Sequence, residues 1–336
     1  MNALRIGRRT VGPGRPCYVI AEIGSNHDGK LAQALRMIAV AAKMGADAVK
    51  FQCLDYDRMY AHRDATLLRL FRRIRLDEAW LPKLKACADR HGVEFLASPC
   101  YLEAVPLLER VGARLYKIAS PQTLAFPQLV SAVARTGKPV VISTGYCEDE
   151  AVTRAVRLCR REGNRRYALL HCVSSYPTTP RDAQLRVMDA LRQRFRCPVG
   201  LSDHSLGTTL ATAAAARGAC IIEKHFTLDR RLRGPDHAFA AEPEELRALV
   251  RAVRDVEAAL SAPGRILLPA EERAARGLHY RILAARPITA GAPVRPPFVY
   301  RRAPAGIAAA DEPRLSGRVS ARDIRAGSIL HWEDLR

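Results

Sequence analysis

The sequence predicts an α/β fold, a (β/α)8 barrel of the TIM type, followed by a small β-rich domain. Apolar, β-rich runs alternate with helical periods from residue 17 to residue 260, giving eight β–α units. Several helical segments stop at a glycine directly before the next run, where a helix C-cap is expected. No G-x-G-x-x-G follows the first run, as a dinucleotide-binding sheet would require. Eight such units fit a closed barrel better than an open doubly wound sheet.

The eight predicted strands are placed by their apolar runs. They cover residues 17–24, 48–53, 93–99, 114–120, 139–145, 167–173, 198–205 and 220–227. The clearest predicted helices cover residues 30–45 and 243–260, where apolar side chains recur at helical spacing. The glycines expected to end helices are Gly45, Gly92, Gly112, Gly137 and Gly218.

The C-terminal part follows a different pattern. We expect a barrel domain over residues 1–262, a linker over 263–280 that could hold a short charged helix, and a second domain over 281–336. The second domain contains two similar phrases, "ILAARPITAGAPV" and "GRVSARDIRAGSIL". Each reads as a short strand, a turn with glycine and another apolar stretch, which predicts a small β-rich domain with an internal repeat.

Charge and composition narrow the classes of partner. The formal net charge is +20, which by itself is compatible with nucleic-acid binding. The arginines are spread over nearly every segment, however, and only 6% of residues are aromatic, which leaves little for stacking on bases. We therefore expect no nucleic-acid partner and, instead, a locally positive pocket for an anionic substrate.

Cysteine usage and hydropathy predict a cytoplasmic protein without a membrane partner. The nine cysteines are scattered and form no C-x-x-C pair, which is typical of reduced thiols rather than a disulfide framework. No apolar run reaches the roughly 18 residues of a membrane span. The N-terminal residues also lack the apolar region of a signal peptide.

Polar residues gather where the predicted strands end. In a barrel of this kind, chemistry takes place at the carboxyl ends of the strands. The opposite strand ends supply nothing comparable, and this asymmetry favours an enzyme over a purely structural protein. The residues concerned are Glu22, Lys50, Gln52, Ser98, Lys117, Ser120, Ser143, Thr144, His171, Ser202, Asp203, His204, Glu223 and His225.

Two histidines form a candidate metal site. His204 and His225 end neighbouring predicted strands, so their imidazoles could converge on one divalent ion. The alternative is that each is an ordinary histidine at the barrel rim. In the run "CIIEKHFT", strand alternation places Glu223 on the same face as His225 and Lys224 on the other.

A second set of residues suits an anionic ligand. Two lysines and three serines at strand ends are the groups that bind phosphate or carboxylate: Lys50, Lys117, Ser120, Ser143 and Ser202. Asp236, in "RGPDHAF", is expected in a turn above the barrel mouth, where it could serve either the site or an Asx turn.

At this point several phrases match a known family. "AEIGSNHDG", "VKFQ", "KIAS", "ISTG", "GLSDHS" and "EKHFTLDR…GPDH" resemble the sialic acid synthases, a family that includes legionaminic and pseudaminic acid synthases. The resemblance covers nearly all of residues 17–260. The tail, with "VYRRAPAGI" and "GRVSARDIRAGSILHWEDL", resembles the C-terminal antifreeze-like (SAF) domain of that family, a β-clip fold.

The resemblance implies a metal-dependent condensation of phosphoenolpyruvate with the open-chain aldehyde of an acylamino sugar, with release of phosphate. Under it, His204 and His225 would hold the metal, Mn2+ in the first place, with Mg2+ or Co2+ as alternatives. The positions that match the phosphoenolpyruvate site are Lys50, Lys117, Ser120, Ser143 and Ser202. The positions that match the sugar or the reacting centre are Glu22, Gln52, Tyr176 and Asp236. Arg302 matches a tail arginine that reaches the acceptor in the partner subunit, which implies a domain-swapped homodimer.

Two departures from the family pattern concern the acceptor. The family usually reads S-x-E after the fourth strand, whereas this chain reads Ser120-Pro121-Gln122. A glutamine cannot act as the general base that a carboxylate provides. The segment of residues 54–76, expected as a loop that helps to cover the sugar, is also shorter than in typical members. We therefore expect an acceptor other than N-acetylmannosamine.

Two alternatives remain open at the level of the sequence. The chain could make another ulosonic acid from a different or a phosphorylated aldose, although the tail argues against this. It could also be a degenerate homologue that binds a sugar without turnover. Gln122 is the only support for that second alternative, and the retained histidines and lysines oppose it.

Overall fold

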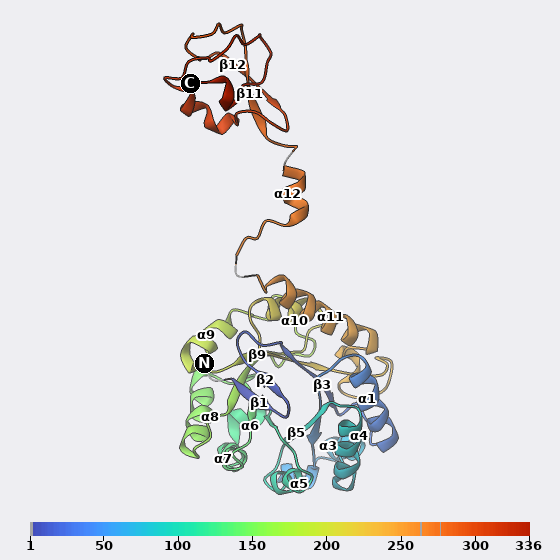
Figure 1. The fold of residues 1–336 in the computed structure, drawn as a ribbon. Helices are drawn as coiled ribbons and strands as arrows, with labels where there is room; N and C mark the ends of the chain where they lie inside the picture. The colour runs from blue at the N-terminus through green and yellow to red at the C-terminus, as the bar shows by residue number, and fades with distance from the viewer. Residues whose placement is uncertain (1–2, 263, 276) are drawn as a thin grey trace. The chain divides into compact units, whose positions relative to one another are not determined.

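The computed structural model describes residues 3–262, 264–275 and 277–336. These residues form two compact units, one ending at Ser261 and the other running from Ala262 to Arg336 (Figure 1). The expected linker over 263–280 contains helix α12, Pro269–Ala275. Residues 263 and 276 of that predicted linker lie outside the described residues.

The first unit is a closed barrel of eight parallel strands, which confirms the predicted fold class. The strand order around the barrel is β10-β3-β4-β5-β6-β7-β8-β9. The strands are β3 (Tyr18–Gly24), β4 (Ala48–Cys53), β5 (Glu94–Pro99), β6 (Tyr116–Ile118), β7 (Val140–Ser143), β8 (Tyr167–Cys172), β9 (Val199–Asp203) and β10 (Ile221–His225). The predicted strand over 114–120 is shorter than expected, because Ser120 already begins a helix.

Helices connect the strands and cover the outside of the barrel (Figure 1). They are α1 (Leu31–Lys43), α2 (Tyr56–Met59), α3 (Ala65–Ile74), α4 (Leu81–Arg90), α5 (Ala104–Arg110), α6 (Ser120–Ala125), α7 (Pro127–Arg135), α8 (Asp149–Arg161), α9 (Val187–Phe195), α10 (Thr209–Ala216) and α11 (Pro243–Ala259). All five glycines predicted to end helices have a left-handed backbone, for example Gly45 with φ 93° and Gly218 with φ 80°.

The segment of residues 54–76, expected as a loop, is mostly helical. It contains α2 and α3, whose first turns are capped by the side chains of Asp55 and Asp64. Each carboxylate accepts hydrogen bonds from two backbone N–H groups of the following turn, which stabilises a helix start. The connection after β4 thus contains two short helices, which these local caps favour, and its short length relative to other members stays a prediction.

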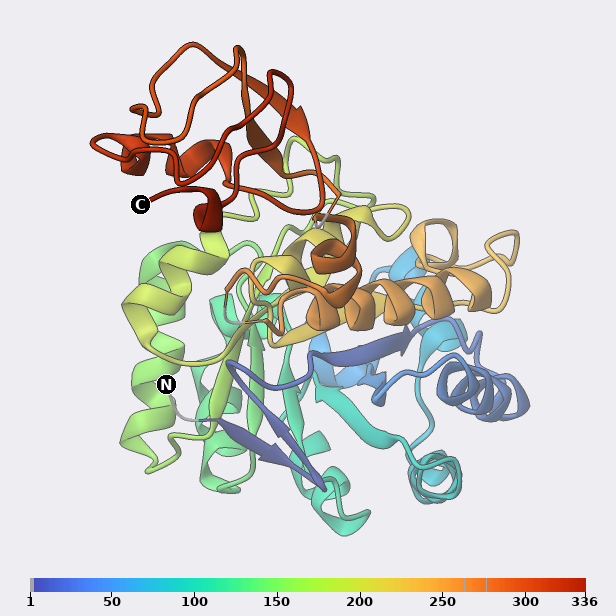
Figure 2. The same ribbon diagram turned by 45° about the horizontal axis from the view of Figure 1, so that its top comes forward.

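An N-terminal hairpin closes the end of the barrel opposite to the carboxyl ends of the strands. It consists of β1 (Leu4–Ile6) and β2 (Arg9–Val11), drawn in dark blue in Figures 1 and 2. Leu4, Ile6 and Val11 join a buried apolar cluster with inward-facing side chains of the barrel strands. The sequence analysis did not predict this hairpin, because its strands are only three residues long.

The second unit contains one regular antiparallel pair, β11 (Tyr280–Ala284) with β12 (Phe298–Arg302). The two similar phrases lie against each other: antiparallel bridges join Leu283 to Ile329, Ile288 to Ile324 and Pro293 to Val319. Only the first phrase contains a regular strand, because turns interrupt the rest of the pairing. A small apolar core holds this unit together, including Ile282, Val294, Ile307, Ile324 and Leu330.

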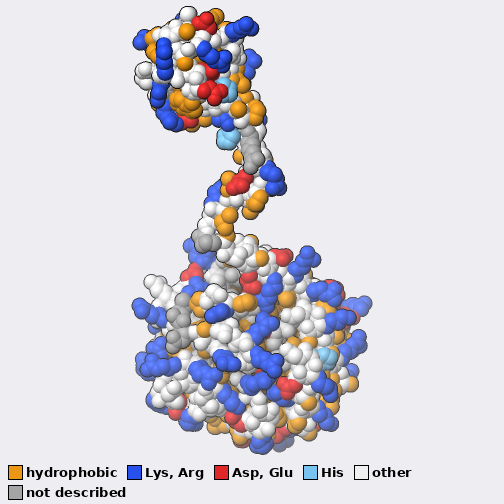
Figure 3. All heavy atoms as spheres, viewed as in Figure 1, with side chains coloured by type: hydrophobic (Ala, Val, Ile, Leu, Met, Phe, Trp, Pro, Cys, Tyr) orange, Lys and Arg blue, Asp and Glu red, His pale blue; other side chains and the backbone are white. Residues whose placement is uncertain are grey.

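Basic side chains are dispersed over the surface. On the face shown in Figure 3, Lys and Arg side chains occur over the whole barrel unit, with uncharged and acidic groups between them. Within the described residues, no helix combines the length and the hydrophobicity that crossing a bilayer requires.

Candidate active site

On some strands of the barrel, the inward-facing side chains change from apolar to charged toward the carboxyl end. On β4, Ala48 belongs to the apolar cluster inside the barrel, and the next inward residue is Lys50. On β10, Ile221 belongs to the same cluster, and the next inward residue is Glu223. The carboxyl-terminal half of the barrel interior is therefore lined by charges.

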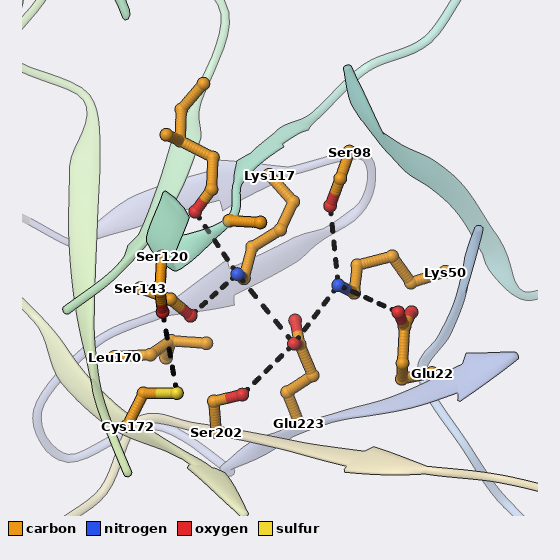
Figure 4. Close-up of polar contacts among 12 residues, drawn as sticks. Glu22, Lys50, Ser98, Lys117, Ser120, Ser143, Leu170, Cys172, Ser202 and Glu223 are labelled. Atoms are coloured by element: carbon orange, nitrogen blue, oxygen red, sulfur yellow. Dashed lines mark hydrogen bonds and ion pairs between the residues drawn. The ribbon is translucent and has the colours of Figure 1, made fainter. Parts of the chain in front are cut away.

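Two buried lysines and two buried glutamates form one ion-pair network (Figure 4). Lys50 Nζ lies 3.2 Å from Glu22 Oε1 and 3.2 Å from Glu223 Oε1. Lys117 Nζ lies 3.8 Å from Glu223 Oε1 and donates a hydrogen bond of 2.6 Å to Ser143 Oγ. The four residues are only 0–4% exposed. Because buried charges are costly even when paired, this network indicates a functional site rather than a stabilising one.

Burial opposes every charge in this network, and the partners decide which charges remain. Burial raises the pKa of Glu22, against the attraction of the Lys50 ammonium group. Burial also acts on Glu223, but the ammonium groups of Lys117 and Lys50 outweigh it and lower the pKa of that carboxyl. Burial lowers the pKa of Lys117 to about 8, whereas the two glutamates outweigh burial at Lys50 and raise its pKa. The two glutamates therefore differ: burial favours the neutral acid at Glu22, and the two lysines favour the carboxylate at Glu223.

The network forms the floor of a cavity of about 270 Å3. Of the residues to which the family resemblance gave a role, all but Asp236 and Arg302 line this cavity, namely Glu22, Lys50, Gln52, Lys117, Ser120, Gln122, Ser143, Tyr176, Ser202, His204 and His225. Of the other polar residues predicted at strand ends, Glu223 lines it, whereas Ser98, Thr144, His171 and Asp203 do not. Four of the lining side chains have a buried polar atom without a hydrogen-bond partner among the described residues: Glu22 Oε2, Gln122 Oε1, Glu223 Oε2 and His225 Nδ1. Unpaired buried polar atoms in a cavity are partners for a ligand.

Three serines, Ser120, Ser143 and Ser202, line the same cavity. Ser202 Oγ donates to Glu223 Oε1 over 3.2 Å. Ser120, the first residue of α6, accepts a hydrogen bond of 3.0 Å from the backbone N–H of Gly145 and lies 3.6 Å from Cys172 Sγ. Ser143 accepts a hydrogen bond from Lys117, and all three predicted serines line the same cavity as the two lysines, a combination that suits an anion.

The two predicted metal ligands lie next to each other. The ring centroids of His204 and His225 are 5.4 Å apart. His204 Nδ1 lies 2.8 Å from the carbonyl oxygen of Val173, so an N–H there leaves the Nε2 lone pair available. Burial lowers the pKa of His225 to about 4, so its imidazole is neutral at physiological pH. Its Nδ1 has no hydrogen-bond partner and lies 3.8 Å from Asp236 Oδ2.

These residues fit a divalent cation held by two imidazoles. Among the described residues, no group of three or more His, Cys, Asp or Glu side chains is arranged to hold a metal. The protein would therefore supply two nitrogen ligands and leave further positions to substrate or water, a donor set compatible with Mn2+.

Asp236 lies beside the cavity and is held by the loop after β3. Its Oδ2 accepts a hydrogen bond of 2.8 Å from Ser25 Oγ, a side chain from that loop. The adjacent residue, His237, is fully buried between Thr227 and Asp28. Its Nδ1 lies 2.7 Å from Thr227 Oγ1, and its Nε2 lies 3.2 Å from both carboxylate oxygens of Asp28. These contacts tie the loops after β3 and β10 together and fix Asp236 next to His225.

The remaining predicted residues differ in their surroundings. Gln52 Nε2 donates to Glu22 Oε1, so the amide orients one oxygen of that carboxylate. The ring of Tyr176 lies 4.3 Å from that of His204, and burial raises the pKa of its phenol. Arg302 belongs to the second unit, where it is exposed and its guanidinium lies 5.5 Å from the centre of the Tyr280 ring. Its reach into a partner subunit stays a prediction.

Strand alternation predicts some of the cavity residues, and others have no signal in the sequence. Glu223 was placed on the face of His225 by strand alternation, and Lys224 does point the other way, where it pairs with Asp203 at 2.6 Å. Cys172 could have been found by the same alternation on β8, two residues after the inward-facing Leu170. Tyr60 and Tyr146 also line the cavity. They lie in loops, for which no periodicity exists.

The fold and the cavity define the class of protein: a (β/α)8-barrel enzyme whose site, at the carboxyl ends of its strands, is lined by lysines, glutamates and histidines. Sequence comparison matches residues 37–264 to the family described as the NeuB family. The chain belongs to that family, which confirms the resemblance seen in the sequence. The matched residues leave out most of the tail, whose antifreeze-like nature stays a prediction.

Individual relatives support this assignment. The spore coat polysaccharide biosynthesis protein SpsE of Bacillus subtilis is 41% identical over 273 residues, covering 77% of this chain and 73% of SpsE. The N,N'-diacetyllegionaminic acid synthase of Legionella pneumophila is 32% identical and covers 98% of this chain and 97% of its own length. The crystal structure of an N-acetylneuraminic acid synthetase from Leptospira borgpetersenii has a TM-score of 0.76 and 32% identity, over 82% of this chain and 95% of that one.

Proposed function

We propose that this enzyme condenses phosphoenolpyruvate with the open-chain aldehyde of an acylamino sugar to give a nonulosonic-type 2-keto-3-deoxy sugar acid and phosphate. The observation that carries the proposal is the pair of buried lysines that both contact Glu223, in a cavity that three serines also line. Membership of the NeuB family and the named synthases among the relatives support the same reaction class.

The anion site would hold phosphoenolpyruvate. Lys50 and Lys117 would bind its phosphate and carboxylate, and the hydroxyls of Ser120, Ser143 and Ser202 would complete the hydrogen bonds. Both lysines are held in place by Glu223, so they are oriented before the substrate arrives.

The bond changes balance without an external oxidant or reductant. Carbon 3 of phosphoenolpyruvate forms a bond to the aldehyde carbon, and the aldehyde oxygen takes a proton. Water adds its oxygen to carbon 2, the carbon–oxygen bond to phosphate breaks, and the 2-keto acid and inorganic phosphate remain. Glu22, with a raised pKa and one unpaired oxygen, is suited to exchange a proton at this point.

His204 and His225 would hold the metal, Mn2+ in the first place, with Mg2+ or Co2+ as alternatives. A divalent ion bound there supplies Lewis-acid polarisation of the aldehyde oxygen. The two imidazoles, one oriented by Val173 and the other beside Asp236, are this chain's contribution.

The acceptor would lie between the floor and the cavity mouth. Gln52, Tyr176 and Asp236 would contact the sugar or the reacting centre, and Gln122 would offer a neutral amide where the family usually has a carboxylate. We propose on this basis an acceptor other than N-acetylmannosamine. Arg302 would reach the acceptor of a partner subunit in a domain-swapped homodimer. A shorter or phosphorylated aldose, or binding without turnover, remain the alternatives.

The test is phosphate release from phosphoenolpyruvate in the presence of Mn2+, across a panel of acylamino, simple and phosphorylated aldoses. We expect release that depends on one class of acylamino aldehyde and falls at least about 100-fold in His225→Ala. Equal rates of phosphate release with N-acetylmannosamine and with the best other aldose would contradict the acceptor proposal. No release from folded, metal-loaded protein with any aldose would contradict the proposed function.

A further inference from the structure

A second cavity, which we call the hairpin cavity, lies at the amino-terminal end of the barrel beside the hairpin β1–β2. Its volume is about 490 Å3, within the range of pockets that take small molecules. The turn of the hairpin forms one wall, and residues at the starts of β3, β4 and β5 form others. The hairpin cavity shares no lining residue with the active-site cavity, which lies at the other end of the same strands.

Tyr18 brings a buried hydroxyl group to the hairpin cavity. Only 2% of this residue is exposed, and its hydroxyl has one polar contact among the described residues, at 3.5 Å from the backbone oxygen of Asp47. That distance is long for an O–H···O hydrogen bond, and the same oxygen already accepts the backbone N–H of Glu94 at 3.0 Å. A buried donor without a good acceptor, at the wall of a cavity, indicates a place for an acceptor on a ligand.

The two buried carboxylates of the hairpin cavity are already paired. Asp47 lies 2.7 Å from a guanidinium nitrogen of Arg9 and 3.2 Å from one of Arg254. Both oxygens of Glu94 accept from Nε of Arg114, at 3.0 and 3.1 Å. A cationic ligand would therefore compete with arginines for both carboxylates.

The rim of the hairpin cavity has positive charge to spare. Its third carboxylate, Asp89, pairs with Lys85. Arg8 lines the cavity and has no carboxylate within ion-pair distance among the described residues. A guanidinium group carries five N–H donors, and Arg9 and Arg114 use only some of theirs in their ion pairs. The free donors of the cavity therefore favour an anion.

The backbone that carries Arg8 is fixed by a close contact. Gly7 and Arg8 form the two-residue turn of the hairpin, and Gly7 has a left-handed backbone with φ 55°. A Cβ atom on Gly7 would lie 2.8 Å from Glu94 Oε2, so only glycine lets the turn approach this carboxylate so closely. Arg8 thus extends from an ordered turn, which reduces the entropy lost when a ligand binds.

We propose that the hairpin cavity is a second binding site, for a small molecule with a phosphate or carboxylate group held by Arg8, Arg9, Arg114 and the phenol of Tyr18. Planar guanidinium groups can donate two hydrogen bonds to either kind of anion, and the phenol adds another donor. Asp47 and Glu94 keep two of the arginines in place. This inference goes beyond the proposed function and does not depend on it, because the two cavities share no residue.

Isothermal titration calorimetry with four probes tests the chemistry of the ligand. The probes are glycerol 3-phosphate, citrate, neutral glycerol and the diamine putrescine. We expect at least one of the two anions to bind with a Kd in the millimolar range or lower, and glycerol and putrescine to bind at least about tenfold more weakly. The anion that binds more tightly shows whether the site prefers a phosphate ester or a carboxylate.

Three variants locate the binding, because these anions can also enter the active-site cavity. Arg8→Gln removes a guanidinium group that has no ion pair to lose, and Tyr18→Phe removes only the hydroxyl, so both should fold normally. The Kd of the better anion at one binding event should rise at least about tenfold in Arg8→Gln and about fivefold in Tyr18→Phe. Arg5→Gln is the matched control, since Arg5 is exposed on β1 of the same hairpin but does not line the cavity.

The outcomes either support or overturn the inference. Weaker anion binding in Arg8→Gln and Tyr18→Phe, with wild-type binding in Arg5→Gln, supports it. Unchanged binding in all three variants would place the anion elsewhere and overturn it. Equal weakening in Arg8→Gln and Arg5→Gln would indicate general attraction to a basic surface and would also overturn it. So would putrescine binding more tightly than both anions, or the absence of any anion with a Kd in the millimolar range or lower.

Discussion

The two halves of the barrel interior are built from the same eight strands and hold opposite kinds of side chain. In the amino-terminal half, Leu96, Val141 and their neighbours pack with the hairpin β1–β2 in a cluster without charges. In the carboxyl-terminal half, Lys50, Lys117 and Glu223 point into the barrel. Each of them lies two residues after a member of the apolar cluster, namely Ala48, Leu115 or Ile221. A few ångströms along the barrel axis thus separate an apolar core from an ion-pair network.

This difference shows how one barrel divides stability from function. Burying the apolar cluster lowers the free energy of the folded state at roughly 25 cal/mol per Å2 of apolar surface. The charged half is costly to bury, and two of its glutamate oxygens have no partner among the described residues. Such incompletely paired groups are expected where selection acts on ligand binding. Substitutions in the two halves should therefore have separable effects.

The largest expected effect follows from removing a lysine of the charged half. Lys50→Met leaves Glu22 and Glu223 buried without their shared cation, which should lower the free energy of unfolding by about 3–5 kcal/mol. The folded fraction should also lose phosphate release by at least about 100-fold, because an electrostatic contact to the substrate is gone. Urea unfolding and single-turnover assays measure the two effects.

A second buried lysine provides the matched control for that experiment. Lys224 pairs with Asp203 on the outer face of the barrel strands and does not line the cavity. Lys224→Met should destabilise the fold by a similar amount, about 3–5 kcal/mol, but leave the folded enzyme active. Equal losses of activity in both variants would contradict the division between the two halves.

The apolar half should respond in stability alone. Leu96 is fully buried, and Leu96→Ala should lower the free energy of unfolding by about 2–5 kcal/mol, because it leaves a cavity. At a temperature where the variant is folded, its kcat and both KM values should equal those of the wild type. A change in the KM of phosphoenolpyruvate larger than about threefold would show that the halves are coupled.

The charged half should also respond to pH in the alkaline range. Burial lowers the pKa of Lys117 to about 8, so its ammonium group is present below that pH and lost above it. The KM of phosphoenolpyruvate should therefore be constant below pH 8 and rise above it, by up to about tenfold per pH unit. Lys117→Arg keeps its charge throughout this range and should remove the dependence. A wild-type KM that stays flat to pH 9.5 would contradict this assignment.

The smallest expected effect comes from the residues that position Asp236. His237→Gln removes the contact with Asp28 but does not replace Asp236 itself, which keeps Ser25 as a hydrogen-bond partner. We expect a loss of roughly tenfold in kcat or in Mn2+ affinity with an unchanged KM of phosphoenolpyruvate, because the effect is indirect. His171→Gln, a change at another buried histidine that does not line the cavity, is the control. Equal effects of both substitutions would indicate a purely structural role for His237.

The sequence by itself determined the alternation of strands and helices, and thus the barrel. Apolar runs with period two and glycines at helix ends are local signals, so all eight strands could be placed within a few residues. The same alternation put Lys50, His204, Glu223 and His225 at the carboxyl ends of strands, where the structure brings them into one cavity. The hairpin β1–β2 and the helices between residues 54 and 76 were not predicted from the sequence, because their signals are short or depend on caps.

Only the tertiary structure decided which of these groups act on one another. Glu22 and Glu223 lie some 200 residues apart in the chain yet share Lys50. Their pKa values shift in opposite directions, because burial prevails at Glu22 whereas the second ammonium group, that of Lys117, helps to outweigh burial at Glu223. The link between Asp28 and His237, and the left-handed backbone that holds Tyr146 at the cavity mouth, are likewise absent from any local pattern. Burial and distance set these interactions, because electrostatic energy depends on separation in space and on the loss of water, and neither is encoded by spacing along the chain.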